Sequence, residues 1–139
     1  AAYVLDYMES LTETPRYCWV AGYSFGAWIC LQLLMRRPEI DGFIAVSPPA
    51  NHYDLSFLAP CPASGLILSG DQDKVAPPAD IERSLTKVRV QKGEVISRDV
   101  VPGANHFYQG KLEEMTAKCA DYLDTSIAKA DRERLGEID

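Results

Sequence analysis

Four short apolar runs alternate with stretches of helical periodicity along this chain, and this alternation limits the possible fold more than any other feature of the sequence. The runs lie at residues 17–21, 42–47, 65–70 and 95–101, and each has the composition of a strand. Strands that alternate with helices pair in parallel through right-handed crossovers. The sequence therefore predicts an α/β fold, with one mostly parallel sheet and helices on both of its faces.

Apolar residues at helical spacing predict a helix in each segment next to these runs. The four expected helices cover residues 1–11, 25–37, 77–93 and 112–127. A turn at residues 12–15, which ends in a proline, is expected to close the first helix. In an open parallel sheet the ligand site lies at the carboxyl ends of the strands, so we expect the reactive side chains there.

Length and composition are those of one globular domain. A chain of 139 residues can bury a single core, and we expect one domain over residues 1–130 and a polar tail over residues 131–139 that frays. The apolar content is 47%, without a run long enough to cross a membrane. The net charge is −6 and Lys and Arg form no block, which argues against nucleic acid and membrane surfaces as partners.

The four cysteines, Cys18, Cys30, Cys61 and Cys119, show no C-x-x-C spacing, and the chain has only two histidines. A zinc site would therefore have few ligands to draw on, and no disulfide framework is indicated. We expect four reduced structural thiols, no metal, and a cytoplasmic protein.

A serine stands between two glycines in the stretch Gly22-Tyr23-Ser24-Phe25-Gly26, directly after the first apolar run. A serine hydroxyl becomes a nucleophile only when it is held beside a base, and a sharp strand-to-helix turn would expose it. Such a turn crowds the backbone, so we expect both glycines to be required. The Phe25 N–H would face a developing oxyanion at the helix N-terminus. The alternative is that Ser24 is an ordinary helix N-cap.

The pattern GYSFG resembles the nucleophile elbow of the α/β-hydrolase superfamily. The later stretch GDQDKVAP resembles the acid turn of that superfamily and favours Asp73 over Asp71, and PGANHF resembles its histidine turn at His106. The chain order Ser, Asp, His is also that of the superfamily, whereas His52 precedes the aspartate. The resemblance implies that Ser24 is the nucleophile, His106 the base and Asp73 the residue that orients the base. For Asp73 the alternative is ordinary turn chemistry, and for His106 it is a satisfied loop histidine without a catalytic role.

Longer stretches, AGYSFGAW, SPPANHYDLSFLAPCP and PGANHFYQGKLEE, look like a bacterial subfamily of small α/β-hydrolases related to dienelactone hydrolases and carboxylesterases. The resemblance runs from about residue 1 to residue 128. It covers the later part of that domain, because the family carries further strands ahead of this region, together with the loop that donates a second oxyanion-hole N–H. We therefore expect an exposed sheet edge at residues 17–21, through which the chain can self-associate.

The resemblance implies a serine hydrolase that cleaves small-molecule carboxylic esters or thioesters through an acyl-enzyme, without a cofactor. The same triad serves a peptidase or an acyltransferase, and a binding module without catalytic activity is the alternative from another class. Tyr23, and Tyr53 and Phe57 in the loop at residues 51–58, are candidate substrate contacts. Aromatic residues in such turns and loops also serve as packing residues, which is the alternative for these three.

Overall fold

The computed structural model describes residues 2–11 and 16–136 of the 139-residue chain. Strands and helices alternate along it. In chain order they are α1 (Ala2–Glu9), β1 (Trp19–Tyr23), α2 (Phe25–Leu34), β2 (Gly42–Val46), the short 3-10 helix η1 (Ser56–Leu58), β3 (Gly65–Gly70), α3 (Pro78–Leu85), β4 (Ile96–Val101) and α4 (Leu112–Arg134).

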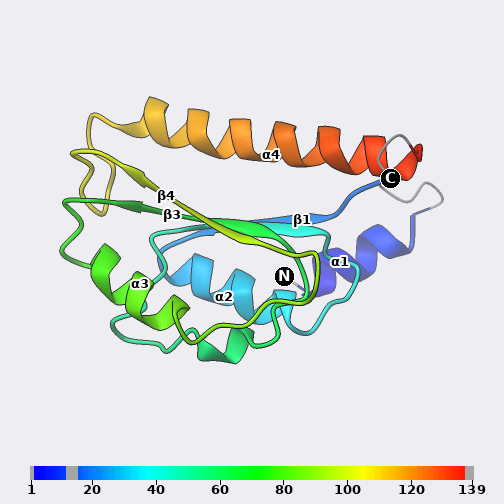
Figure 1. Ribbon diagram of the computed structural model, residues 1–139, viewed down its shortest axis with the longest axis horizontal. Coiled ribbons are helices and arrows are strands. Elements are labelled where there is room, and N and C mark those ends of the chain that lie inside the picture. The colour runs from blue at the N-terminus through cyan, green and yellow to red at the C-terminus, as the bar shows by residue number, and fades with distance from the viewer. Residues whose placement is uncertain (1, 12–15, 137–139) are drawn as a thin grey trace.

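The four strands form one parallel sheet in the order β1-β2-β3-β4. Helix α4 covers one face of the sheet, and α1, α2 and α3 lie against the other (Figure 1). The predicted α/β class, the parallel sheet and the helices on both faces are therefore confirmed. Strands β1 and β4 are the edges of the sheet, and β2 and β3 are buried along their whole length.

The core has two parts because successive residues of a strand point to opposite faces of the sheet. On the side of α2 and α3, Phe43 and Ile67 pack with Leu31 of α2. On the side of α4, the core contains Val46 and Leu68, which belong to the same two strands. Complete burial of such a side chain stabilises the fold by roughly 1.5 to 3 kcal/mol. This two-sided packing fixes the register of the central strands, and so it fixes where their carboxyl ends lie.

Strand β1 begins at Trp19, two residues later than expected, and it runs on to Tyr23. The preceding residues make other contacts. The Tyr17 hydroxyl donates a 2.6 Å hydrogen bond to Asp131 of α4, and the Cys18 N–H donates to the carboxylate of Asp41. Because the strand ends at Tyr23, it leads without a linker into Ser24.

Two helices end earlier than expected. Helix α2 stops at Leu34 rather than residue 37, and the Arg37 guanidinium lies outside it and pairs with Glu39 and Asp6. Helix α3 stops at Leu85, well before residue 93.

The last helix is longer than expected, since α4 continues to Arg134 and residue 131 lies inside it. The Tyr17 hydroxyl bonds to Asp131 in this last part of the helix. The expected turn at residues 12–15 and the end of the tail at 137–139 lie outside the described residues.

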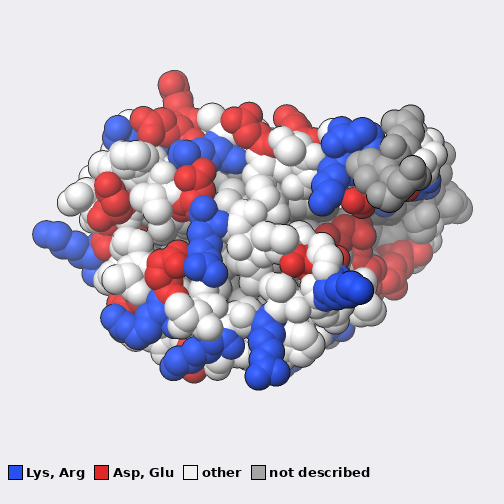
Figure 2. All heavy atoms as spheres, in the orientation of Figure 1, with Lys and Arg blue, Asp and Glu red and all other residues white. Residues whose placement is uncertain are grey.

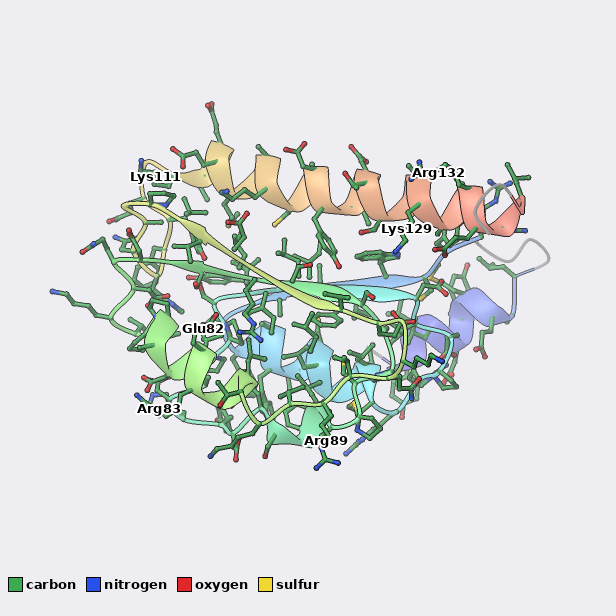
Figure 3. All side chains as sticks on the ribbon, in the orientation of Figure 1. Glu82, Arg83, Arg89, Lys111, Lys129 and Arg132 are labelled. Atoms are coloured by element: carbon green, nitrogen blue, oxygen red, sulfur yellow. The ribbon has the colours of Figure 1, made fainter. Side chains whose placement is uncertain are left out.

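Charged side chains of both signs are interspersed over the face drawn in Figure 2. Among them, Glu82 of α3 pairs with Arg98 of β4 at 2.7 Å, which ties α3 to the edge of the sheet (Figure 3 labels Glu82). All four cysteines are free, and burial raises the pKa of each thiol. In the described part of the chain, no helix is both long enough and apolar enough to cross a membrane.

Candidate active site

Ser24 is the single residue between the end of β1 and the start of α2, and its backbone has φ 56° and ψ −123°. A positive φ at a residue other than glycine is strained and is held by its surroundings. Here the Ser24 N–H donates a 2.8 Å hydrogen bond to the carbonyl of Val46 on the neighbouring strand. The chain therefore makes the sharp strand-to-helix turn that the sequence predicts, and the serine side chain stands at its tip.

The two glycines of the elbow have different roles. A Cβ at Gly22 would lie 2.3 Å from the carbonyl oxygen of Gly26, so no other residue fits at Gly22 without a backbone shift. A Cβ at Gly26 would meet no heavy atom within 4 Å among the described residues outside its own helix. The expectation that crowding requires both glycines is therefore wrong for Gly26. The crowding is one-sided, because the backbone of Gly26 itself fills the space next to Gly22.

Ser24, His106 and Asp73 form a continuous hydrogen-bonded chain. Ser24 Oγ lies 2.9 Å from His106 Nε2, and His106 Nδ1 lies 2.7 Å from Asp73 Oδ2. Ser24 follows β1, Asp73 lies in the turn after β3, and His106 lies in the loop after β4. The parallel sheet brings these three turns to one edge, so residues that lie 82 and 33 positions apart in the sequence come into contact.

The carboxylate of Asp73 is held by backbone groups of its own turn. Its Oδ1 accepts hydrogen bonds from the N–H groups of Val75, at 2.9 Å, and Ala76, at 2.8 Å, which leaves Oδ2 for His106. An ionised carboxylate can only accept, so Nδ1 of His106 must carry the proton in this contact. Nε2 of a neutral imidazole is then an acceptor and can take the proton of the Ser24 hydroxyl.

The two residues that the sequence ranked second lie outside this chain of contacts. Asp71 accepts a 2.6 Å hydrogen bond from the N–H of Gly103, so it ties the acid turn to the start of the histidine loop. His52 is exposed in the loop after β2 and makes none of the contacts of Ser24 or Asp73. The structure therefore brings together the residues that the sequence favoured.

The Phe25 N–H is the first amide of α2. In the part of the chain that the structure describes, it has no hydrogen-bond partner. The first N–H groups of a helix are unpaired within the helix, and the helix dipole places partial positive charge there. This group can therefore stabilise negative charge that develops beside Ser24 Oγ.

Aromatic side chains surround the elbow on the side of α2. Trp28 stacks on Tyr53 with ring centroids 4.5 Å apart, and the exposed ring of Phe25 lies 5.8 Å from Trp28 and 6.1 Å from Tyr53. Phe57 contacts the edge of Trp28 at 6.5 Å and is half-buried against the core. Tyr53 is thus part of an exposed aromatic surface next to Ser24, while Phe57 packs against Trp28 on the side of the core. Tyr23 differs from both, because its hydroxyl donates to the backbone of His106.

On the side of α4, a cavity of about 550 Å³ borders the same elbow. Its walls include Tyr23, Phe107, Leu112, Met115 and Cys119, and most of its surface is apolar. The edge of the sheet that carries Ser24 therefore lies between an aromatic surface and an apolar cavity.

Sequence reasoning did not predict one buried contact that lies next to the site. The hydroxyl groups of Ser47 and Tyr108 lie 2.7 Å apart, both residues are fully buried, and both have a positive φ. Burial raises the pKa of Tyr108 to about 12, so this pair stays uncharged. It joins the end of β2 to the loop that carries His106. The position of Tyr108, two residues after His106, was the only available signal for it.

Similar proteins were found by sequence and by structure, while no family model matches the chain. An uncharacterized protein of Rickettsia prowazekii is 41% identical over 129 residues, which cover 90% of this chain and 54% of that protein. A protein of unknown function from Agrobacterium tumefaciens, described as a candidate α/β hydrolase, superposes with a TM-score of 0.81 at 54% identity. The match covers 92% of this chain and 59% of that protein.

An α/β serine hydrolase homologue from Coxiella burnetii superposes with a TM-score of 0.74 at 28% identity, over 88% of this chain and 56% of that protein. The chain thus spans a little more than half the length of each of these relatives. These likenesses agree with the parallel sheet and with the strained elbow at Ser24, since all of them point to the same superfamily. The chain belongs to the α/β-hydrolase superfamily.

Proposed function

We propose that this chain carries the catalytic triad of a serine hydrolase that cleaves small-molecule carboxylic esters or thioesters through an acyl-enzyme. The observation that carries the proposal is the unbroken contact from Ser24 Oγ through the His106 imidazole to the Asp73 carboxylate. This arrangement is the one that activates a serine, and it recurs on unrelated folds.

In the first half of the proposed reaction, Ser24 Oγ attacks the carbonyl carbon of the ester while His106 Nε2 takes the hydroxyl proton. The carbonyl oxygen becomes an oxyanion, which the Phe25 N–H and the N-terminal end of α2 stabilise. His106 then gives its proton to the leaving alcohol or thiol, and the acyl group stays on Ser24. Asp73 keeps the proton on Nδ1 and stabilises the imidazolium that forms between the two transfers.

In the second half, a water molecule takes the place of the alcohol. His106 Nε2 removes a proton from this water, the resulting hydroxide attacks the acyl carbon, and the same imidazole returns the proton to Ser24 Oγ. The products are the carboxylic acid and free enzyme. The proposed residues need no metal or organic cofactor for either half, because each proton that leaves one group is taken up by another.

The exposed aromatic surface supports a role in substrate binding for Tyr53 by direct contact, and for Phe57 only through its packing against Trp28. Phe25 lies next to Ser24 and is 53% exposed, and Tyr53 beside it is 38% exposed. An apolar or aromatic group of the substrate would remove this surface from water. In this proposal Phe57 acts by holding Trp28 and Tyr53 in place, and it does not contact the substrate itself.

The test is covalent labelling of the purified chain with a fluorophosphonate, followed by mass spectrometry of the labelled peptide, together with turnover of a p-nitrophenyl ester. We expect one label on Ser24, and we expect Ser24→Ala to lose both the label and the turnover. Ser10→Ala is the matched control, because the bond of this hydroxyl among the described residues is to the Tyr7 carbonyl of α1. A wild-type chain that takes up no label would contradict the proposed function.

A further inference from the structure

Tyr23, the residue before the nucleophile, is bonded to the loop that carries the base. Its hydroxyl donates a 2.6 Å hydrogen bond to the backbone carbonyl of His106, from a position 83 residues earlier in the sequence. The two rings also face each other, with centroids 5.3 Å apart and planes inclined by 35°. Tyr23 therefore contacts both the backbone and the ring of His106.

Two bonds join the elbow to the histidine loop within the described residues, and Tyr23 makes one of them. The other is the contact of Ser24 Oγ with His106 Nε2. Two neighbouring residues of the elbow, Tyr23 and Ser24, are therefore both bonded to His106. Tyr23 bonds to its backbone carbonyl, and Ser24 bonds to its imidazole. The serine contact must break and re-form during turnover, whereas the tyrosine contact can persist.

The rest of the loop is held from other directions. Asn105 Oδ1 accepts the N–H groups of Phe107 and Gln109, which shapes the turn itself, and Tyr108 is joined to the end of β2. None of these contacts joins the histidine loop to the elbow at residues 22–26. The bond from Tyr23 thus fixes the position of His106 relative to Ser24, and a shift of the whole loop would break this bond.

We propose that Tyr23 is a positioning residue, which holds the His106 imidazole at hydrogen-bond distance from Ser24 through the backbone carbonyl of His106. The catalytic role of this contact rests on the proposed function, whereas the hydrogen bond itself does not depend on it. The Tyr23 hydroxyl is thereby bonded to the protein and is not free for the substrate, although the residue is 43% exposed.

The chemistry of the hydroxyl fits this role. Burial, and then the negative charge of Asp73, raise the pKa of Tyr23, so the group keeps its proton and remains a donor at neutral pH. A carbonyl oxygen can only accept, so the direction of the bond is fixed. Phenylalanine at this position would keep the ring contact and remove only the bond.

The experiment compares Tyr23→Phe with Tyr17→Phe in the 139-residue chain. Tyr17 is a matched control, because its hydroxyl is also half-buried and also donates a 2.6 Å hydrogen bond, in its case to Asp131. The first readout is the rate of fluorophosphonate labelling. The second is the low-field proton NMR signal of the His106 Nδ1–H, which is simple to assign because the chain has only two histidines.

We expect Tyr23→Phe to label about 10-fold more slowly, because small displacements of a catalytic group carry large costs in rate. We also expect its Nδ1–H signal to exchange faster with water, while Tyr17→Phe behaves like wild type in both readouts. An unchanged Nδ1–H signal in Tyr23→Phe, or the absence of that signal from wild type, would overturn the inference. An unchanged labelling rate in a chain that labels at all would overturn it as well. If wild type takes up no label, the proposed function fails and the imidazole signal alone decides the role of Tyr23.

Discussion

Asp73 Oδ2 lies 2.7 Å from His106 Nδ1, and the two side chains are 0% and 6% exposed. Two backbone N–H groups hold the other oxygen of the same carboxylate. The carboxylate is therefore fixed in direction, and it dictates which nitrogen of the imidazole carries the proton.

Asp73→Asn is expected to lower ester turnover by about 10⁴-fold with little change in fold, because an amide can donate to Nδ1 and so favours the wrong tautomer. Asp71→Asn is the control, since its remaining oxygen can still accept the Gly103 N–H. It should keep turnover within a few-fold of wild type. Steady-state rates with a p-nitrophenyl ester measure both, and equal losses would contradict the assignment of Asp73.

His106→Ala should abolish labelling of Ser24 and turnover nearly as completely as Ser24→Ala, because the base is lost. His52→Ala should leave both close to wild type, since His52 is exposed and has no contact with Ser24 or Asp73. The two variants are compared by labelling rate at one pH. A larger effect at His52 would show that the wrong histidine was chosen.

The two glycines of the elbow should respond differently to alanine. Gly22→Ala forces a Cβ to within 2.3 Å of the Gly26 carbonyl oxygen, so a loss of roughly 1 to 3 kcal/mol in the free energy of unfolding is expected. Gly26→Ala meets open space within α2, and the better helix propensity of alanine should make it neutral or stabilising by up to about 1 kcal/mol. Urea unfolding measures both values. Equal losses at the two positions would contradict the one-sided crowding of the elbow.

The free energy of unfolding should fall at high pH because of Tyr108. Its pKa is raised from 10.0 to about 12 in the fold, so the unfolded chain ionises first as the pH rises. The stability is therefore fully present below pH 10, and roughly 2 to 3 kcal/mol of it is lost between about pH 10 and pH 12. Urea unfolding across this range should show a smaller decline in Tyr108→Phe than in wild type, and parallel declines would contradict the prediction.

The edge of the sheet at β1 should make the isolated chain self-associate. In the described part of the chain no strand pairs with the outer side of β1, and the apolar cavity beside α4 opens along it. An unpaired edge next to an apolar surface is a template for pairing with another copy. Sedimentation should show concentration-dependent association that Ala21→Lys reduces, since a charge on an edge strand opposes pairing. A wild-type chain that stays monomeric would refute this expectation.

The sequence by itself determined the layout of this protein. The alternation of apolar runs with helical periodicity predicted the parallel sheet and its two helical layers, because burial patterns repeat every two or three to four residues and can be read locally. The elbow at Ser24 could be located for the same reason, since a strand, a small residue and a helix follow one another there. The choice of Asp73 and His106 needed a resemblance in addition, because a single aspartate or histidine in a turn carries no local pattern.

Only the tertiary structure decided which distant groups touch. The bond from Tyr23 to His106 spans 83 residues and the pair of Ser47 with Tyr108 spans 61, and neither leaves a trace in local spacing. Strand register sets such contacts, and register depends on how both faces of the sheet pack. Tertiary contacts also decided two smaller features. Strand β1 starts at Trp19 while Tyr17 bonds to Asp131 of α4. The space at Gly26 is open because the crowding at the elbow affects Gly22 alone. The sequence could therefore locate Ser24 as the candidate nucleophile, while the contacts that hold His106 in place depend on how the strands pair.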